Sequence, residues 1–530
     1  MTTIASYTPG TTPRNLPIGI QSFEKLRRAG YLYVDKTALV YSLVTTNNPY
    51  FLSRPRRFGK SLLLSTFEAY FQGKRELFEG LAIEQLETEW ASHAVLHLDL
   101  NAGKYDSVEQ LEDKLLNQLE RWERQYGVTY IARGNSDRFQ NVIEQAAHQT
   151  GRGVVVLIDE YDKPMLQSFH DTKLQEEFRN ILTAFYTVLK SADQWLRFVF
   201  ITGVTKFAQM GIFSTLNQLN DISFDEDFNA LCGMTRAEIE AVFPPELERM
   251  AQDNELTYGE CVERLTCKYD GYRFTASRRF EGMYNPFSVL SALKKRQFGN
   301  YWFASGTPTF LAEMLRKTNY DLRELDGIQV SAASLTDDRA NPDNPVPMIY
   351  QSGYLTIKDY DEELQLYTLG YPNEEVKYGF LNFITPFYTA LPASDTPFYI
   401  GQFVHELRAG NVEAMLCRLR AFFADFPYEL NDRTERHYQV VFYLVFKLLG
   451  QFIHAEVRSA HGRADAVVET ADTVYVFEFK LRGTAEEALA QIDDRGYLIP
   501  YTVDGRRLVK IGAEFSAEER NLSRWIIGEE

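Results

Sequence analysis

The segment Arg54–Ser61 limits what this chain can fold into more than any other feature. Its sequence, RPRRFGKS, stands between a short apolar run at 50–52 and a helical pattern at 60–71. A strand, a loop ending in Gly-Lys-Ser and a helix form a site for a nucleoside triphosphate, because backbone N–H groups surround the phosphates, the lysine contacts their outer oxygens and the hydroxyl binds Mg²⁺. Arg54 stands where the general pattern has its first glycine. The loop alone therefore also fits a basic helix N-terminus in an unrelated α/β protein.

A second motif lies about a hundred residues downstream, at the spacing expected within one nucleotide-binding domain. Val154–Ile158 is an apolar run that ends in Asp159 and Glu160. Asp159 is placed to hold Mg²⁺ through water, and Glu160 to polarise an attacking water. A buried strand with a solvated acidic turn is the alternative. The phosphate loop and a third apolar run, which ends at Thr202, favour a nucleotide site over that alternative.

We predict one nucleotide site from these segments. Glu160 is its catalytic residue, and Ser61 and Asp159 are its metal ligands. The predicted nucleotide-binding residues are Arg57, Phe58, Gly59, Lys60, Ser61, Asp159 and Thr202. Thr205 is an alternative to Thr202 as the residue that senses the γ-phosphate, and a simple turn role is open for both. Arg57 also fits a solvated basic loop.

The alternation of apolar runs and helical patterns predicts an α/β fold. Continuous apolar strands separated by helices are typical of a parallel sheet that is covered on both faces. The expected strands are 50–52, 95–100, 154–158 and 197–201, and the expected helices between them include 60–71 and 111–126.

A chain of 530 residues is too long for one ordinary domain. We expect a P-loop domain at 1–225, a helical and mixed middle region at 226–410 and a small C-terminal α/β domain at 411–530. Within the middle region, 225–330 is expected to be mainly helical and 348–361 β-like, with an exposed connection at 341–347. Residues 1–16, rich in Thr and Pro, are expected to be a loosely held arm.

The C-terminal range holds a second candidate site. Asp465 is followed thirteen residues later by Glu478, and Lys480 comes next but one. The segment 474–480 alternates, so Glu478 and Lys480 project from one face of a strand, and Asp465 is expected at the end of the preceding strand. Two carboxylates can hold a hard divalent ion, and a nearby cation can act on the attacking water or the scissile phosphate. A glutamate and a lysine on one strand are also commonly a solvated ion pair.

Two helical patterns flank this cluster. The apolar stripe at 441–449 predicts an amphipathic helix before the strands, and 484–492 predicts a second helix after them. Helices and strands in this order are enough for a small separate domain.

Further motifs extend through the chain. They are LPIGIQSFEKLRRAGYLYVDKTALVYSL before the phosphate loop, IDEYDKP at 158–164, ITGVTKF at 201–207, YDGYRF at 269–274, NPFSVLSAL at 285–293 and YWFASGTPTFL at 301–311. With the phosphate loop, and in this order, they resemble the bacterial AAA-ATPase-like family that carries a C-terminal nuclease-like domain. The resemblance implies ATP as the nucleotide. In that family RPRRFGKS is the usual form of the loop, which accounts for Arg54.

The C-terminal cluster resembles the PD-(D/E)XK nuclease superfamily, whose fold is that of restriction endonucleases. The resemblance implies that Asp465, Glu478 and Lys480 are catalytic and that Asp465 and Glu478 bind Mg²⁺ or Mn²⁺. It further implies that Glu435 and Gln491 are accessory positions of the nuclease site.

The charge of the chain constrains its partners only weakly. The formal net charge is −17, and residues 431–530 hold 13 Lys and Arg against 17 Asp and Glu. Affinity for nucleic acid comes largely from phosphate neutralisation, so binding of DNA or RNA is predicted from the site and not from the charge. DNA and RNA are both open, and so is assembly into a homo-oligomer.

We expect a cytoplasmic protein that does not span a membrane. The longest aliphatic run, 154–158, is far shorter than the ~20 residues needed to cross a bilayer. The N-terminus lacks the apolar segment of a secretory signal. Four cysteines without a CxxC spacing argue against a disulfide framework and against structural zinc.

Two functions are compatible with these patterns. One is a nuclease that ATP drives or regulates. The other is a nucleotide-switched interaction protein, whose nuclease-like domain binds but does not cut. Intact ligands are necessary for cleavage and not sufficient, so the sequence leaves both open.

Overall fold

The computed structural model divides the chain into two compact units. The first comprises Met1–Phe310 and Gly327–Glu375, and the second comprises Leu311–Asp326 and Val376–Glu530. The structure describes residues 14–46, 48–130, 132–168, 171–206, 218–277, 279–304, 311, 315, 320–335, 344–389, 395–424, 435–457, 464–480, 482–503, 505–516, 518–519 and 521–529. The three domain ranges expected from the sequence remain a prediction.

The first unit is built on a five-stranded parallel sheet. Its strands are β1 (Pro49–Ser53), β2 (Val95–Asp99), β3 (Val154–Asp159), β4 (Leu196–Gly203) and β5 (Asn220–Asp221). Their order is β2-β3-β4-β1-β5, and every neighbouring pair runs parallel. The four strands expected from apolar runs are confirmed. All residues of β3 are buried, as in a strand that is covered on both faces.

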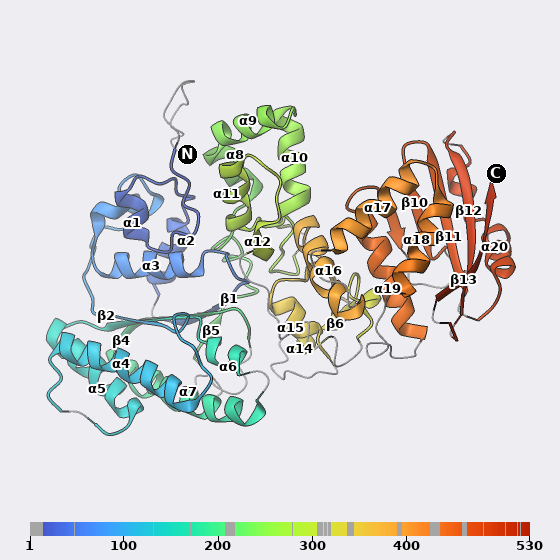
Figure 1. Cartoon of the computed structure of the whole chain (residues 1–530). Coiled ribbons are helices and arrows are strands. Elements are labelled where there is room, and N and C mark those ends of the chain that lie inside the picture. Colours follow the sequence, from blue (N-terminus) through green and yellow to red (C-terminus); the bar gives the residue numbers. More distant parts are fainter. Residues whose placement is uncertain are drawn as a thin grey trace. The chain divides into compact units, whose positions relative to one another are not determined.

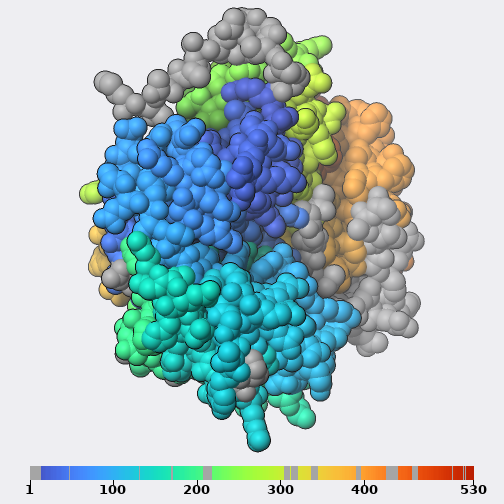
Figure 2. Space-filling model, turned by 90° about the vertical axis from the view of Figure 1, so that its left-hand side faces the viewer, coloured from blue at the N-terminus to red at the C-terminus, as the bar shows by residue number. Residues whose placement is uncertain are grey.

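Helices cover both faces of this sheet (Figure 1). One layer holds α1 (Phe23–Arg28), α2 (Thr37–Val44) and α3 (Lys60–Phe71), and the other holds α4 (Val108–Tyr126), α5 (Asn135–Thr150) and α7 (Thr172–Ser191), next to the short α6 (Lys163–Gln167). The space-filling view shows the layers as a blue surface above a cyan-to-teal one (Figure 2). The expected helices at 60–71 and 111–126 are confirmed, and the second begins earlier, at Val108.

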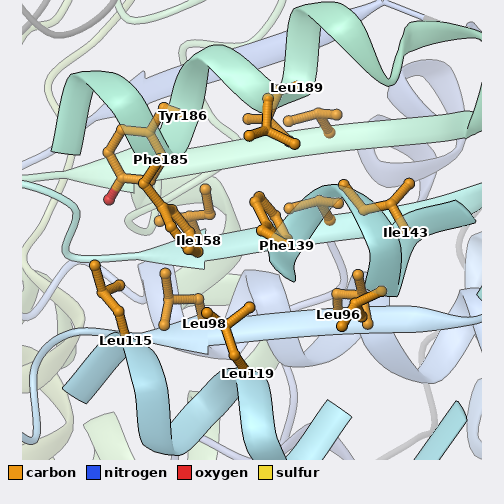
Figure 3. Packing of buried hydrophobic residues seen from close by; sticks show 14 of the residues in the cluster. Leu96, Leu98, Leu115, Leu119, Phe139, Ile143, Ile158, Phe185, Tyr186 and Leu189 are labelled. Atoms are coloured by element: carbon orange, nitrogen blue, oxygen red, sulfur yellow. The ribbon is translucent and has the colours of Figure 1, made fainter. Parts of the chain in front are cut away.

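The main core of the first unit lies between the sheet and α4, α5 and α7. Figure 3 labels ten of its buried side chains: Leu96, Leu98, Leu115, Leu119, Phe139, Ile143, Ile158, Phe185, Tyr186 and Leu189. The rings of Phe139 and Phe185 stack with centroids 4.4 Å apart. Since this core fixes the strands, it also fixes the carboxyl ends of β3 and β4, from which Asp159 and Thr202 project.

The remaining part of the first unit is mainly helical between 225 and 304, as expected. Its helices are α8 (Arg236–Val242), α9 (Pro244–Asp253), α10 (Tyr258–Tyr269), α11 (Pro286–Lys295), α12 (Tyr301–Ala304), α14 (Ala332–Leu335) and α15 (Val346–Gln351). An antiparallel sheet follows in the order β6 (Gln329–Ser331), β8 (Leu366–Gly370) and β7 (Thr356–Asp361).

Two expectations near 341–361 need correction. The expected β structure at 348–361 is wrong for its first part, because α15 ends at Gln351 and β7 begins at Thr356. The expected exposed connection at 341–347 is wrong for Pro345–Pro347, which are buried, while 341–343 lie outside the described residues. Pro345 caps α15 and Pro347 lies in its first turn, where a missing N–H costs nothing. These prolines therefore start a helix.

The second unit combines helices with a five-stranded mixed sheet. Its helices are α16 (Glu374–Thr389), which begins at the end of the first unit, α17 (Thr396–Arg408), α18 (Val412–Ala424), α19 (Glu435–Leu449) and α20 (Ala485–Asp494). The strand order is β13 (Asn521–Glu529), β12 (Arg507–Ser516), β11 (Thr473–Lys480), β10 (Ala466–Glu469) and β9 (His454–Val457). Strands β11 and β12 run parallel, with α20 between them in the chain, and the other pairs run antiparallel.

Helices α19 and α20 confirm the two amphipathic patterns predicted at 441–449 and 484–492. Phe442 and Phe446 of α19 pack against Phe479 and Phe477 of β11, with centroids 4.3 and 5.0 Å apart. Helix α20 packs on β11 and β12. Both faces of β11 are therefore covered.

The division into units means that the chain passes between them three times, after Phe310, Asp326 and Glu375. In the part of the chain that the structure describes, no helix combines the length and the apolar character needed to cross a membrane.

Candidate nucleotide site and candidate nuclease site

The phosphate loop, residues 54–61, connects β1 to α3. Two of its residues, Arg57 (φ 68°) and Gly59 (φ 95°), have left-handed backbone conformations, and Gly59 is the N-cap of α3. Lys60 is buried, and its Nζ donates to the carbonyl oxygens of Arg54 (2.9 Å) and Pro55 (3.1 Å). The loop thus curls around its own lysine, which is the shape that presents backbone N–H groups to phosphate.

Arg54 has a structural role within the loop. Only 1% of it is exposed, and its Nη1 donates to the carbonyl oxygens of Ser53 (2.9 Å) and Ser223 (2.8 Å). Its guanidinium lies over the Phe274 ring, 4.1 Å from the centroid, and burial lowers its pKa to about 10. Arg54 therefore ties the loop to β1 and to more distant segments, where a glycine could make no such contacts.

Phe58 can offer a nucleotide only its backbone. Its ring is buried against Tyr272 and Phe274, with centroids 4.8 and 5.4 Å apart, and its carbonyl accepts from Gly233 N at 3.1 Å. The YDGYRF motif thus packs against the phosphate loop.

The carboxyl ends of β3 and β4 meet beside the loop. Thr202 is fully buried, and its hydroxyl donates to Asp159 Oδ1 at 2.7 Å. Thr205 donates in the same way to Asp162 Oδ2, at 2.6 Å. Both hydroxyls therefore donate to carboxylates, and Thr202 orients the side chain of Asp159.

Glu160 directly follows β3 and has a left-handed backbone, with φ 50°. Burial raises the pKa of Glu160, the neighbouring charge of Lys60 opposes that rise, and the charge of Asp162 adds to it. A carboxyl with a raised pKa beside a lysine is suited to work as a base.

A cavity of about 320 Å³ opens at the loop, within the range of small-molecule sites. Its polar wall contains Arg56, Arg57, Gly59, Lys60, Ser61, Asn101, Glu160 and Lys163. Its apolar wall contains Pro17, Ile20, Leu26, Leu32, Val34, Met234, Phe243, Phe287 and Leu290. In the part of the chain that the structure describes, Asp159 and Thr202 do not line this cavity. One wall suits phosphates and the other suits a base.

The second candidate site lies where β10 and β11 pair. Ala466 pairs with Phe477 across the antiparallel strands, so Asp465, the residue before β10, lies beside Glu478. The N–H of Phe479 donates to Asp465 Oδ2 at 2.8 Å. The expectation that Asp465 ends the preceding strand is wrong. It precedes a strand that runs antiparallel to β11, and this direction brings it to the carboxyl end of β11.

Glu478, Lys480 and Gln491 form one hydrogen-bonded group. Lys480 Nζ lies 3.4 Å from Glu478 Oε1. The Gln491 amide bridges them, since its Nε2 donates to Glu478 Oε1 and its Oε1 accepts from Lys480 Nζ. Thr484 and Glu487 form a capping box at the start of α20, which fixes the helix that carries Gln491.

Burial raises the pKa of both carboxyls. Burial raises the pKa of Glu478 to about 7, and the charge of Asp465 adds to the rise while Lys480 opposes it. Burial also raises the pKa of Asp465, against the hydrogen bond from Phe479 and the charges of Lys480 and Arg323. Glu478 Oε2 is buried without a hydrogen-bond partner among the described residues.

Comparisons with known proteins match both of the domains that carry these candidate sites. A family model described as a predicted AAA-ATPase matches residues 17–213, and one described as the PD-(D/E)XK nuclease superfamily matches 433–525. A protein of Azotobacter chroococcum mcd 1, described as an uncharacterized protein in the vnfD 5′ region, is 36% identical over 97% of this chain and 99% of its own length. This chain belongs to the AAA-ATPase-like family with a C-terminal PD-(D/E)XK nuclease domain.

Among solved structures, the ORC2 protein of Aeropyrum pernix, in ADPNP and ADP complexes, is similar with a TM-score of 0.24 and 12% identity. The similarity covers 69% of this chain and 92% of that one.

The donor set of the nuclease domain fits a divalent metal. The half-buried Asp465 and the buried Glu478 lie side by side, and Glu478 Oε2 has no hydrogen-bond partner among the described residues. Across those residues no group of three or more His, Cys, Asp and Glu side chains could hold a metal. Helix α19 begins at Glu435, whose side chain lies outside the described residues.

The nucleotide site of this AAA-ATPase-like chain also fits its expected ligand. Lys60, Ser61 and Glu160 line one cavity together with apolar side chains. Sequence reasoning missed Asn101, Lys163 and that apolar wall. The IDEYDKP motif could have indicated Lys163, because it contains this residue together with Glu160. The apolar lining residues come from segments scattered along the chain, so no single motif indicates them.

Proposed function

We propose that this chain binds Mg·ATP in its first unit and uses it to drive or regulate a metal-dependent nuclease in its second unit. The observation that carries the proposal is the group Asp465, Glu478, Lys480 and Gln491, with an unpaired carboxylate oxygen at its centre. The proposal includes the expected catalytic roles of Glu160, Asp465, Glu478 and Lys480, and places the protein in the cytoplasm.

At the nuclease site each side chain has a distinct task. Asp465 and Glu478 would hold Mg²⁺ or Mn²⁺, which when bound stabilises charge on a phosphate and activates water. Lys480 places its ammonium next to that place, and Gln491 keeps the ammonium oriented. Glu478 is shielded from bulk water, since it is only 3% exposed. The residues thus orient a phosphodiester and neutralise its charge.

The path of the chain supports coupling between the two activities. The chain passes between the units three times, which gives three covalent connections through which a change in the nucleotide-binding unit would reach the second unit.

The test is a cleavage assay on the full-length protein with Mg²⁺ or Mn²⁺. The substrates are single- and double-stranded DNA and RNA, with and without ATP. We expect metal-dependent cleavage that Lys480→Ala abolishes. The matched control is Lys510→Ala, because Lys510 lies on the neighbouring β12 and is bonded to Asp493 of α20.

Cleavage by Lys480→Ala at the wild-type rate would refute the proposed site. Binding of nucleic acid that changes with ATP, without cleavage under any condition, would favour the nucleotide-switched interaction protein.

A further inference from the structure

A lysine outside the phosphate loop lines the nucleotide cavity. Lys163 is the first residue of α6, and its side chain is half-buried at the cavity that Lys60, Ser61 and Glu160 also line. Within the described residues its ammonium makes no hydrogen bond and no ion pair. The cavity therefore contains a cation that has no structural task among those residues.

The backbone around Lys163 is held by the ends of two strands. After β3 the chain turns at Glu160, which has φ 50°, and the N–H of Lys163 donates to the carbonyl of Glu160 at 3.0 Å. The preceding residue, Asp162, is fully buried, and its Oδ2 accepts from the N–H groups of Val204 and Thr205 at 3.0 and 2.6 Å. The backbone of Lys163 is thus anchored to the carboxyl ends of both β3 and β4.

The two threonines expected to sense the γ-phosphate already donate to carboxylates. The hydroxyl of Thr202 donates to Asp159 and that of Thr205 to Asp162, and neither threonine is among the described residues that line the cavity. ATP differs from ADP by its γ-phosphate, so a site that distinguishes them needs a group that binds this anion. A side chain next to Glu160 is suited to that task, because Glu160 is placed to polarise the water that attacks the γ-phosphate.

The position of Lys163 differs from that of the other cations in the cavity. Arg56 and Arg57 belong to the phosphate loop, and Lys36 is paired with a glutamate at 2.5 Å. Lys163 instead follows β3, three positions after Glu160. Burial raises the pKa of Glu160, and the charge of Lys163 is among the effects that oppose this rise. This electrostatic effect agrees with the place of Lys163 in the lining of the cavity.

We propose that Lys163 binds the γ-phosphate of ATP and thereby makes the site distinguish ATP from ADP. The inference rests on the proposed binding of ATP by the first unit, and it names the residue that contacts the third phosphate. An ammonium is a compact charge with three donors, so it can bond phosphate oxygens from several directions.

The measurement is a competition titration of the full-length protein in EDTA, which prevents metal-dependent hydrolysis. ATP and ADP each displace a fluorescent ADP analogue. Lys163→Ala is expected to weaken ATP binding about tenfold, as for the loss of one charged hydrogen bond, and to leave ADP binding unchanged. Lys60→Ala is expected to weaken both, because the phosphate-loop lysine also contacts the β-phosphate, which both nucleotides carry.

Three variants control for packing, charge and location. Lys163→Met keeps a long side chain without the charge, so it is expected to lose ATP affinity as Lys163→Ala does. Lys163→Arg keeps the charge and is expected to restore part of the affinity for ATP. Lys173→Ala is the matched control, because Lys173 lies on the next helix, α7, with 86% of its side chain exposed. It is expected to bind both nucleotides as wild type does.

Several results would overturn the inference. One is an equal loss of ATP and ADP affinity in Lys163→Ala, which would indicate a structural role. Others are an unchanged ATP affinity in Lys163→Ala and a restored one in Lys163→Met. A loss of ATP affinity alone in Arg56→Ala, without one in Lys163→Ala, would assign the γ-phosphate to Arg56 instead. If wild type binds neither nucleotide, the proposed nucleotide-binding function itself fails, and this inference with it.

Discussion

Glu478 is expected to carry a proton near neutral pH until a metal ion displaces it. Burial and the charge of Asp465 raise its pKa from 4.5 to about 7. The residue is 3% exposed, so water screens these effects little. A difference of about 2.5 pKa units corresponds to roughly 3 kcal/mol between the two protonation states.

The sign of the resulting pH dependence follows from proton counts. Between the unfolded pKa of 4.5 and the folded value of about 7, the folded protein binds more protons at Glu478 than the unfolded chain does. The contribution of this group to the free energy of unfolding therefore falls as pH rises through that window, by roughly 3 kcal/mol in total. Glu478→Gln should remove this dependence and stabilise the metal-free protein above pH 7.

Because a metal needs the ionised carboxylate, Mn²⁺ must compete with this proton. Calorimetric titration of the full-length protein in two buffers of different ionisation enthalpy counts the protons released. With a pKa of about 7, we expect about 0.9 proton per Mn²⁺ at pH 6 and about 0.1 at pH 8, with affinity falling nearly tenfold per pH unit below 7. Glu478→Gln should bind Mn²⁺ weakly and release no proton, while Lys510→Ala should match wild type in affinity and in protons released. Equal Mn²⁺ affinity in wild type at pH 6 and pH 8 would refute the reasoning.

Four further predictions concern the first unit. Lys60→Ala should weaken ATP binding about a hundredfold in a fluorescent-nucleotide titration, because the ammonium contacts phosphate. Glu160→Gln should bind ATP as wild type does but hydrolyse it at least about a hundredfold more slowly in a phosphate-release assay. Thr202→Val should slow hydrolysis about tenfold without weakening metal-free ATP binding, because only the hydrogen bond that orients Asp159 is lost. Arg54→Leu should lower the free energy of unfolding by about 3 kcal/mol in urea titrations, because buried carbonyls lose their donors.

Sequence patterns predicted the parts of the fold in which one physical rule dominates. The strands β1 to β4 were predictable because strands of a sheet covered on both faces are largely apolar. Helix α3 was predicted with its bounds, since the phosphate loop sets its start. The pairing of Glu478 with Lys480 was also predicted, because the period of two in a strand places both on one face of β11. Periodicity could not predict that Asp465 lies beside Glu478, because this depends on the antiparallel direction of β10 and β11.

The residues that escaped prediction are those whose partners are distant in the chain or belong to the backbone. Arg54 is an example, because composition does not distinguish a buried arginine from a solvated one. It is buried because carbonyls of β1 and of Ser223 surround it, so its charge serves the loop. This burial arises from the packing of segments far apart in sequence, and it assigns Arg54 to stability.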